Sequence, residues 1–443
     1  MGSHFDELLS AIEQKSARVA VIGCGYVGLP LALAVRRAGY HVYAVDTDPE
    51  KVASLERGRS YVAGVGDDEL DAAVRSGRFV AKDYSMNMGE ADVIAICVPT
   101  PLGTYGEPDL SAIVRTGERI AEYLRSGQLI ILESTTYPGT TEEVLRPVLE
   151  KKRLRCGVDY FLAYSPHRDD PGHAERTVRK TPKVVGGLDG PSGDLAEAFY
   201  ERVVTRVVRT TDARTAEAVK ILENVYRAVN IALVNELKTV FHRLGIDTWE
   251  VVEAAATKPF GYQPFYPGPG FGGHCIPVDP FYMSHRARQV GADLRFVELA
   301  GEVNRAMPEW VVSRLLEEAT RRGVRLAGSK VLLIGVAYKP NTADTRESPA
   351  FPIMRRLRAL SVQPVYHDPH VPRVGRLRHY PEFFGMQSAP LTSTTISECA
   401  ACLIITDHAG VDYASLSKHS RLVIDTRGVM RRLGIVSPHI ASA

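Results

Sequence analysis

The sequence predicts an α/β protein in which two Rossmann-like, doubly wound parallel-sheet domains are joined by a long central helix and a helical region. Short apolar runs alternate with helical stretches in the N-terminal part, which is the rhythm of a parallel sheet wrapped by helices. A segment with few helix breakers then spans residues 213–244, and the alternation restarts at Lys330. We therefore expect α/β domains at residues 1–205 and 319–443, with a helical region at 206–318 between them.

The N-terminal domain opens with a strand, a tight turn and a helix. Residues 18–22 form an apolar run typical of a buried strand, and the glycines of residues 23–28 indicate a tight turn. Residues 29–38 continue as a helix that Gly39 can close, and a second strand is expected at 41–45. Later strand-like runs are residues 93–98 and 129–132.

The central region is predicted to be dominated by one helix over residues 213–244, with Gly245 as its C-cap. At 1.5 Å per residue this helix would be on the order of 48 Å long. It could join domains or pair with a second subunit. A Gly/Pro-rich loop follows at 264–280, after which helical character resumes through Leu316.

The C-terminal domain repeats the strand and helix alternation, beginning with KVLLIGVAY at Lys330. We expect a helix over residues 349–360. Further strands are expected at 362–366, 402–406 and 422–425.

Composition excludes some partners. The chain has 443 residues, and its 54 Lys and Arg nearly balance its 52 Asp and Glu, so no broad basic field exists to bind nucleic acid or an anionic membrane. No apolar run approaches the ~20 residues that span a bilayer, and a cytoplasmic location is expected. The six cysteines are scattered, which suits reduced thiols. Cys399 and Cys402 lack a second pair to complete a zinc site, so we expect no metal.

A glycine turn is the strongest local motif. In GCGYVG, Gly23 permits the turn, Gly25 lets backbone N–H groups approach a pyrophosphate, and Gly28 allows close packing of helix on strand. Asp46 ends the next strand, at the usual interval of ~20 residues, where it can bind a ribose 2′-OH and repel a 2′-phosphate. This favours NAD over NADP. Tyr26, Val27 and Lys51 are assigned to the same cofactor site.

A cysteine, an acid and two helical residues suggest catalysis. Glycines surround Phe271 in GPGFGGHCIPVDP, which indicates backbone that closely approaches a ligand. Cys275 in this segment is either a nucleophile or a small buried side chain, and Asp279 follows four residues later. Lys220 and Asn224 are spaced i, i+4, so an ammonium and a carboxamide can together face an oxyanion. Alternatively they belong to an ordinary solvated helix face.

Eight segments occur in a fixed order along nearly the whole chain. They are GCGYVGLPLA, CVPTPLGTYGEPDLS, ESTTYPGTTEE, YSPHRDDPG, KILENVYRAVNIALVNEL, GPGFGGHCIPVDP, GVAYKPNTADTRESP and YHDPHVP. Together they resemble the UDP-glucose/GDP-mannose dehydrogenase family, and more narrowly its UDP-N-acetylglucosamine 6-dehydrogenase branch.

This resemblance implies a four-electron oxidation that uses two NAD per turnover. The sugar CH2OH would lose a hydride to give an aldehyde, which Cys275 would trap as a thiohemiacetal. A second hydride would leave to give a thioester, and water would release the acid. By resemblance, Lys220 and Asn224 stabilise the oxyanion. Asp279 positions or activates water, and Thr135 supports that water and the cofactor.

Binding residues also follow from the resemblance. Pro99, Thr100 and Arg346 are assigned to the cofactor, and Lys339 supplies the local positive charge that a diphosphate needs. The residues assigned to a UDP-sugar substrate are Arg168, Phe265, Tyr266, Gly272, Tyr338 and Lys339.

The chain departs from the family pattern at His167. The family usually has Ser-Pro-Glu-Arg, whose glutamate is thought to act as a base in thioester hydrolysis, whereas this chain has Ser165-Pro166-His167-Arg168. Either the imidazole replaces the carboxylate, or the role is lost or has moved to Asp169 or Asp170. If His167 is the base, hydrolysis should slow as pH falls through about 6.5.

Two other functions stay open. One is an NAD-linked dehydrogenase of a sugar nucleotide or hydroxy acid that stops after one oxidation, which His167 favours and Cys275 opposes. The other is a non-catalytic NAD-binding protein, which the complete catalytic set opposes. ESTTYPGTTEE and TKPFGYQPFYPGPG resemble the N-acetylhexosamine branch, while altered residues 167–169 could retune the sugar pocket. The expected substrate is therefore of the UDP-N-acetylglucosamine or UDP-glucose type.

An apolar stripe on the central helix predicts assembly. Val225, Val229, Leu233 and Leu237 recur at four-residue intervals and need a surface to bury them. We expect a homodimer or a dimer of dimers.

Overall fold

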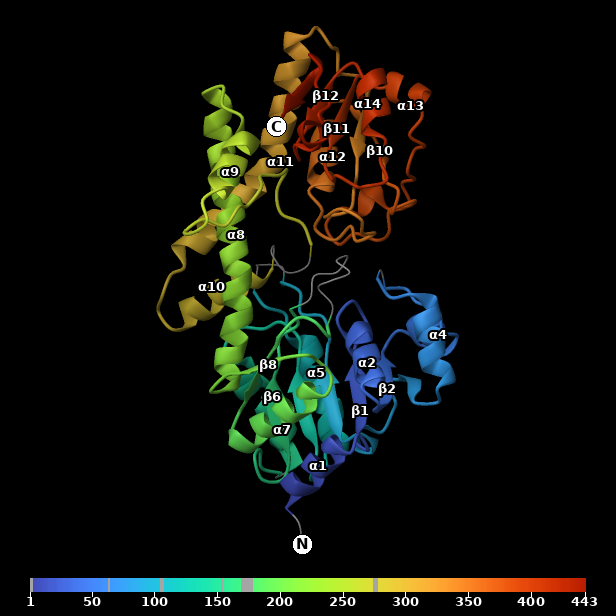
Figure 1. Cartoon of the computed structure of the whole chain (residues 1–443), viewed down its shortest axis with the longest axis vertical. Coiled ribbons are helices and arrows are strands. Elements are labelled where there is room, and N and C mark those ends of the chain that lie inside the picture. Colours follow the sequence, from blue (N-terminus) through green and yellow to red (C-terminus); the bar gives the residue numbers. More distant parts are fainter. Residues whose placement is uncertain (1–2, 63, 104–106, 153, 169–177, 274–277) are drawn as a thin grey trace. The chain divides into compact units, whose positions relative to one another are not determined.

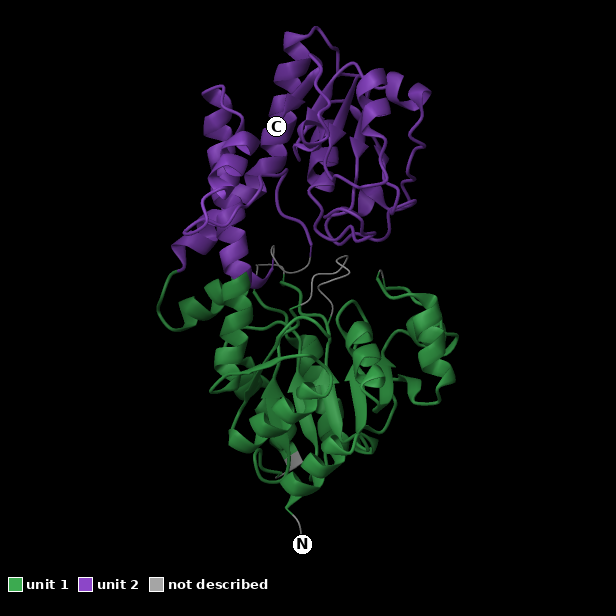
Figure 2. Ribbon diagram, in the orientation of Figure 1, with its two compact units in different colours: residues 1–223, 281–293 green, residues 224–280, 294–443 purple. Residues whose placement is uncertain are grey.

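The computed structural model describes residues 3–62, 64–103, 107–152, 154–168, 178–273 and 278–443. It divides into two compact units (Figure 2). Unit 1 comprises Met1–Glu223 and Phe281–Asp293, and unit 2 comprises Asn224–Pro280 and Leu294–Ala443. The long helix α8 (Ala213–Arg243) begins in unit 1 and continues in unit 2. The three-part division expected from the sequence stays a prediction.

Unit 1 contains an eight-stranded sheet in the order β3-β2-β1-β4-β5-β6-β7-β8. All neighbouring pairs are parallel except β6 with β7. Because β1 pairs with β2 on one side and β4 on the other, the strand order reverses there. The carboxyl ends of β1 and β4 thus form the crevice in which open α/β sheets bind ligands. The strands are β1 (Arg18–Ile22), β2 (His41–Asp46), β3 (Phe79–Asp83), β4 (Val93–Ile96), β5 (Leu129–Leu132), β6 (Phe161–Tyr164), β7 (Lys183–Gly187) and β8 (Val207–Arg209).

Helices cover both faces of this sheet (Figure 1). Along β1, Val19 and Val21 pack with residues of α1 (His4–Glu13), α2 (Gly28–Arg37) and α7 (Gly190–Glu201). Ala20 and Ile22 point to the opposite core, which contains residues of α5 (Ser111–Tyr123), α6 (Arg146–Leu149) and the start of α8. This alternation is what a strand buried on both faces requires. The remaining helices of unit 1 are α3 (Pro49–Glu56), α4 (Asp67–Arg75), η1 (Met88–Glu90), η2 (Thr141–Leu145) and η3 (Glu150–Lys152).

Unit 2 contains a five-stranded parallel sheet in the order β10-β9-β11-β12-β13. One face packs on α11 (Arg295–Arg321) and α12 (Ala350–Ala359), and the other on α13 (Ser393–Ser397), α14 (Tyr413–His419) and α15 (Val429–Arg432). The strands are β9 (Lys330–Ile334), β10 (Gln363–His367), β11 (Ala401–Ile404), β12 (Val423–Asp425) and β13 (Ile440–Ser442). The remaining helices are α9 (Thr248–Ala256), α10 (Asp279–Gln289), which continues into unit 1, and η4 (Pro381–Phe383).

The predicted fold class is confirmed, and the structure refines its details. β1 spans the predicted residues, and the other predicted strands agree within a few residues. Strands β3, β6, β7, β8 and β13 were not predicted. β7 has the sequence KVVGG and β8 is only partly buried, so neither carries a strong apolar pattern. In the part of the chain that the structure describes, no helix is long and apolar enough to cross a bilayer.

Candidate functional site

The glycine turn lies at the carboxyl end of β1, in the crevice of the first sheet. Gly23 has φ +91°, and a Cβ placed on it would lie 2.7 Å from the Cys97 carbonyl oxygen. A Cβ on Gly28 would overlap the Gly23 carbonyl, whereas a Cβ on Gly25 would meet no described atom within 4 Å. Gly25 therefore leaves its backbone open to a ligand beside the N-terminus of α2, as a pyrophosphate site requires.

Asp46 ends β2 beside this turn. Its Oδ2 accepts a hydrogen bond from the Cys24 N–H at 2.9 Å, and its Oδ1 accepts one from the Asp48 N–H at 3.0 Å. Lys51 Nζ lies 3.6 Å from Oδ2. Tyr61 donates its hydroxyl to the Cys24 carbonyl at 2.7 Å. The glycine turn that would bind the pyrophosphate thus also orients Asp46, the residue predicted to bind the ribose. These residues therefore fit a dinucleotide.

Two loops that follow β4 and β5 are joined by side-chain hydrogen bonds. The Thr100 hydroxyl donates to the Thr135 carbonyl at 2.8 Å, and the Ser134 hydroxyl donates to the Val98 carbonyl at 2.7 Å. Tyr282, on α10, donates its hydroxyl to the Thr100 carbonyl. Thr100 is buried while the neighbouring Pro99 is exposed. The predicted cofactor residues and Thr135 therefore belong to one connected edge of the sheet.

A buried ion pair involves Glu133, two residues before Thr135 in the chain. Lys183 Nζ is 2.5 Å from Glu133 Oε2, and Tyr200 donates its hydroxyl to the other carboxylate oxygen. Both charged side chains are almost fully buried. Sequence reasoning missed this pair. Its only signal in the sequence was an acid directly after one apolar strand and a lysine at the start of another, because charges in buried positions are usually paired.

The first turns of α8 hold the loop that follows Thr135. The buried carboxylate of Glu217 accepts hydrogen bonds from the N–H groups of Gly139, at 2.5 Å, and Thr141, at 2.9 Å. It also accepts the Thr141 hydroxyl at 2.6 Å. Burial raises the pKa of Glu217 to about 7, although these donors act against the rise. Glu217 was not predicted as a site residue.

One turn further along α8, Lys220 contacts the segment with the altered family motif. Its buried ammonium donates to the His167 carbonyl at 2.6 Å. Burial and the nearby ammonium groups of Lys220 and Lys183 hold the pKa of His167 well below 6.5. The neighbouring Arg168 pairs with Glu223 on α8, with Nε 3.0 Å from Oε1. The predicted contact of Arg168 with substrate stays a prediction.

In unit 2, Asn224 and Asp279 are joined directly. The Asn224 amide donates to Asp279 Oδ2 at 2.5 Å, and both side chains are nearly fully buried. Asp279 is the first residue of α10. The predicted nucleophile, Cys275, lies outside the described residues, as do Asp169 and Asp170. Asn224 and Asp279, the two predicted catalytic residues that are described in unit 2, therefore lie in direct contact.

The loop that leads to Cys275 is attached to α8 through Gly268. Asn235 accepts a hydrogen bond from the Gly268 N–H at 2.9 Å, and Lys238 donates to the Gly268 carbonyl at 3.0 Å. Burial, reinforced by Arg427, lowers the pKa of Lys238 to about 7. Neither Asn235 nor Lys238 was predicted. Further along the loop, the Gly273 N–H donates to the Arg346 carbonyl at 3.1 Å.

Aromatic side chains surround the same loop. A Cβ on Gly272 would lie 2.6 Å from the Tyr338 Cβ, and one on Gly273 would lie 2.7 Å from its ring, so both positions require glycine. Phe265 packs edge-on against Tyr226, with ring centroids 5.6 Å apart, and Tyr266 is exposed. Gly272 and Tyr338, both assigned to the substrate, thus lie together.

Tyr338, Lys339 and Arg346 lie after β9, at the carboxyl edge of the second sheet. Lys339 Nζ lies 5.9 Å from the centre of the Tyr338 ring, and Arg346 forms a bidentate pair with Asp344. Asp368, at the end of β10, accepts the N–H groups of Val336 and Ala337 at 2.8 and 3.0 Å. Its buried contact with His408, at 3.1 Å, helps to hold its pKa at about 2 despite burial. These bonds fix the start of the loop that carries Lys339.

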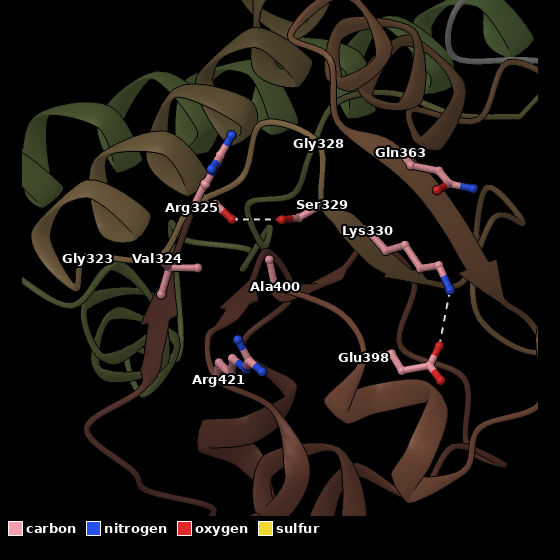
Figure 3. A pocket seen from close by; sticks show the side chains of 10 residues that line it. All are labelled: Gly323, Val324, Arg325, Gly328, Ser329, Lys330, Gln363, Glu398, Ala400 and Arg421. Carbon is pink, nitrogen blue, oxygen red and sulfur yellow. Dashed lines mark hydrogen bonds and ion pairs between the residues drawn. The ribbon is translucent and has the colours of Figure 1, made fainter.

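A hollow of about 740 Å³ lies at the opposite, amino edge of the second sheet (Figure 3). Lys330 and Gln363, which begin β9 and β10, line it, and Lys330 pairs with Glu398 at 3.1 Å. None of the predicted site residues lines this hollow. Across the described ranges, no group of three or more His, Cys, Asp or Glu residues could hold a metal ion.

Comparison with known proteins covers most of the chain. Residues 17–204 match the NAD binding domain of the UDP-glucose/GDP-mannose dehydrogenase family. Residues 214–306 match the central domain of that family, and residues 332–432 match its UDP binding domain.

Individual relatives are similar over nearly their whole lengths. The chain is 37% identical to a UDP-N-acetyl-D-glucosamine 6-dehydrogenase from Pseudomonas aeruginosa over 369 residues, 83% of this chain and 86% of that protein. It is 32% identical to a UDP-N-acetyl-D-mannosamine dehydrogenase from Pyrococcus horikoshii, over 94% of this chain and 96% of that one. A solved structure of a UDP-D-ManNAc dehydrogenase from Pyrococcus horikoshii matches with a TM-score of 0.85 and 30% identity, covering 96% and 98% of the two chains. A UDP-glucose dehydrogenase structure from Pyrobaculum islandicum matches with a TM-score of 0.81 and 27% identity, covering 93% and 94%.

Proposed function

Because the chain belongs to the UDP-glucose/GDP-mannose dehydrogenase family, an NAD-dependent family of nucleotide-sugar dehydrogenases, we propose that it oxidises the C6 primary alcohol of a UDP-sugar to the uronic acid through Cys275. The observation that carries the proposal is the hydrogen bond between Asn224 and Asp279, which joins two of the catalytic residues inferred from the sequence. A buried carboxamide and carboxylate in contact can orient a water or stabilise a developing charge.

The reaction divides into two oxidations and one hydrolysis. NAD, held at the glycine turn and Asp46, would supply the hydride acceptor for each oxidation. The alcohol first loses a hydride and a proton to become an aldehyde, and the Cys275 thiol adds to its carbonyl carbon to give a thiohemiacetal. Loss of a second hydride and a proton gives a thioester, and water then displaces the thiol and releases the carboxylate. The cysteine prevents the aldehyde from leaving between the two oxidations.

Charge stabilisation is proposed to come from α8. The Lys220 ammonium is buried, and it donates a hydrogen bond to the neutral His167 carbonyl. An ammonium in that setting can stabilise an alkoxide more strongly than one exposed to water, because the local dielectric is low. Asn224, one turn later, would donate to the same oxyanion.

Hydrolysis of the thioester requires a base, for which His167 is the proposed group. Its lowered pKa supports a neutral imidazole at neutral pH, and a neutral ring nitrogen can accept a proton from water. The same low pKa makes it a weaker base than an ordinary histidine. Asp169 or Asp170 is therefore the rival assignment.

An N-acetylhexosamine is the proposed sugar. The matched UDP-D-ManNAc dehydrogenase structure has a TM-score of 0.85 and 30% identity, against 0.81 and 27% for the UDP-glucose dehydrogenase structure, which supports this class over UDP-glucose. A second candidate function, a dehydrogenase that stops after one oxidation, is favoured by His167 at the family glutamate position.

A panel of UDP- and GDP-sugars separates these candidates. NADH formed per sugar consumed is measured, and products are identified by mass. We expect two NADH and a uronic acid from a UDP-N-acetylhexosamine, and no acid from Cys275→Ala. One NADH with a released aldehyde would establish the two-electron alternative, and no NADH from any sugar would refute both.

A further inference from the structure

Two adjacent residues of unit 1, His167 and Arg168, are bound to one face of α8 at two neighbouring points. The His167 carbonyl accepts the Lys220 ammonium at 2.6 Å. The Arg168 guanidinium meets the Glu223 carboxylate, with Nε 3.0 Å from Oε1 and 3.3 Å from Oε2. Lys220 and Glu223 are three residues apart, so they are neighbours on the helix surface.

The guanidinium of Arg168 is occupied by protein groups on both of its edges. Nε and Nη2 donate to Glu223, while Nη1 donates to the Pro182 carbonyl at 2.7 Å. The side chains of Arg168 and Glu223 are 24% and 35% exposed, so solvent does not fully screen the pair. This bidentate geometry fixes the guanidinium more firmly than a single contact would.

We propose that the Arg168–Glu223 ion pair, here named the clamp, is a positioning device for Lys220. The clamp fixes the backbone of residues 167–168 against α8, and so holds the His167 carbonyl where it orients the Lys220 ammonium. This inference rests on the proposed function, because it gives Arg168 a positioning role in place of the substrate contact expected from the sequence. The clamp also explains how Lys220 keeps the His167 carbonyl as a fixed partner, although the side chain of residue 167 is not a carboxylate.

The physical reason is the flexibility of lysine. Its ammonium is carried on a four-carbon chain, and only a hydrogen-bond acceptor of fixed position can select one arrangement. Displacement of a catalytic group by about 1 Å can cost on the order of 10²-fold in rate. Loss of the clamp should therefore slow chemistry without weakening substrate binding.

Kinetics with the active sugar of the panel, UDP-N-acetylglucosamine first, test this role. Arg168→Ala and Glu223→Ala should each lower kcat about 10- to 100-fold and leave both KM values within about twofold. The double variant should be no slower than either single one, because both break the same contact. Arg214→Ala, which removes two exposed ion pairs on the same helix, is the matched control and should behave as wild type. A large rise in KM for the sugar nucleotide in Arg168→Ala alone, with Glu223→Ala normal, would overturn the clamp and restore the substrate contact.

A second measurement does not depend on turnover. Folded protein is treated briefly with acetic anhydride, and acetylation of Lys220 is quantified by peptide mass spectrometry. Arg168→Ala, Glu223→Ala and the shape-preserving Glu223→Gln should raise acetylation of Lys220 several-fold, and Arg214→Ala should not. Unchanged labelling in all three clamp variants would refute the proposal even if the wild type oxidises the sugar. If the wild type oxidises none of the panel, the proposed function fails, and the labelling still decides whether the clamp exists.

Discussion

At the scale of single residues, we expect the cofactor preference to depend on the carboxylate of Asp46. Removing it should erode a large preference for NAD over NADP, because a carboxylate at this position can bind a ribose hydroxyl and repel a 2′-phosphate. Lys51, 3.6 Å away, would then be free to attract that phosphate. The measurement is kcat/KM for both cofactors in Asp46→Ala.

Asp48→Ala is the matched control for Asp46, since it removes a carboxylate two residues away that instead caps α3. It should keep the preference for NAD. Equal kcat/KM for the two cofactors in the wild type would contradict the role of Asp46.

His167 determines the expected pH dependence of acid release. As a base it must be neutral, and its folded pKa lies well below 6.5 because of burial and two nearby lysines. We therefore expect hydrolysis to slow only at a pH below 6.5, and not at about 6.5 as the sequence alone predicts. The hydrolysis step should be nearly constant from pH 8 to 6.5. Rapid-quench measurement of acid release across this range checks the prediction.

Replacing His167 with Ala should spare the first hydride transfer and slow acid release by ~10²–10⁴-fold, the usual value of general-base catalysis. An acyl adduct on Cys275 should then accumulate and add mass to the intact protein. Normal turnover with two NADH and no adduct would instead assign the base to Asp169 or Asp170.

At the scale of elements, α8 contacts loops that carry residues proposed for catalysis. Within unit 1, Glu217 holds the loop after Thr135, and Lys220 holds the His167 segment. Within unit 2, Asn235 and Lys238 hold Gly268. Within each unit, α8 thus holds loops that are distant from it in the chain, and support of this kind keeps the geometry of a site precise.

Glu217 gives this helix contact a pH dependence. Its pKa is about 7 in the folded protein, against 4.5 for an ordinary glutamate, so the folded state binds an extra proton between those two pH values. The contribution of Glu217 to the free energy of unfolding should therefore be fully present below pH 4.5. It should fall as the pH rises toward 7. The largest possible effect is about 3 kcal/mol.

Glu217→Gln removes this titration while keeping the side-chain shape. Thermal unfolding of the wild type should lose a few degrees more than the variant between pH 5 and pH 8. Glu142→Gln, a partly exposed acid of η2 next to that loop, is the control and should follow the wild type. Parallel pH curves for wild type and Glu217→Gln would show that Glu217 is ionised throughout.

At the scale of the whole molecule, an exposed apolar stripe on α8 predicts a subunit interface. Leu233 and Leu237, both predicted from the sequence, are 50% and 38% exposed, whereas Val225 and Val229 are partly buried. The exposed stripe follows a three- and four-residue spacing rather than strict four-residue intervals, because α-helices have 3.6 residues per turn. Its members are Leu222, Tyr226, Leu233, Leu237, Val240 and Leu244.

We expect a homodimer or a dimer of dimers, and Leu233→Glu with Leu237→Glu should yield monomers. Placing two carboxylates in an apolar contact leaves them without partners, which costs several kcal/mol. Arg227→Glu, exposed on the same helix but away from the stripe, should keep the wild-type mass. Light scattering at micromolar concentration measures the mass of the wild type and of each variant. A monomeric wild type would contradict the interface.

The strands that were predicted differ from those that were not in how continuous their apolar runs are. β1 and β9 were predicted because buried central strands have continuous apolar runs. β7 was missed because its two glycines weaken that pattern, although it lies beside β6 in antiparallel orientation. β8, at the edge of the sheet beside β7, is short and only partly buried, so its sequence carries little local information.

The sequence by itself determined the fold class, the glycine turn, Asp46 at the end of β2 and the long helix. These depend on periodicity, glycine conformation and helix termination, which act over a few neighbouring residues. Only the tertiary structure decided which groups meet. Arg168 pairs with Glu223, Glu217 with the loop at Gly139, and Asn224 with Asp279. Each pair is separated by more than 50 residues, and a polar side chain gives no local sign of the distant group that will satisfy it once both are removed from water.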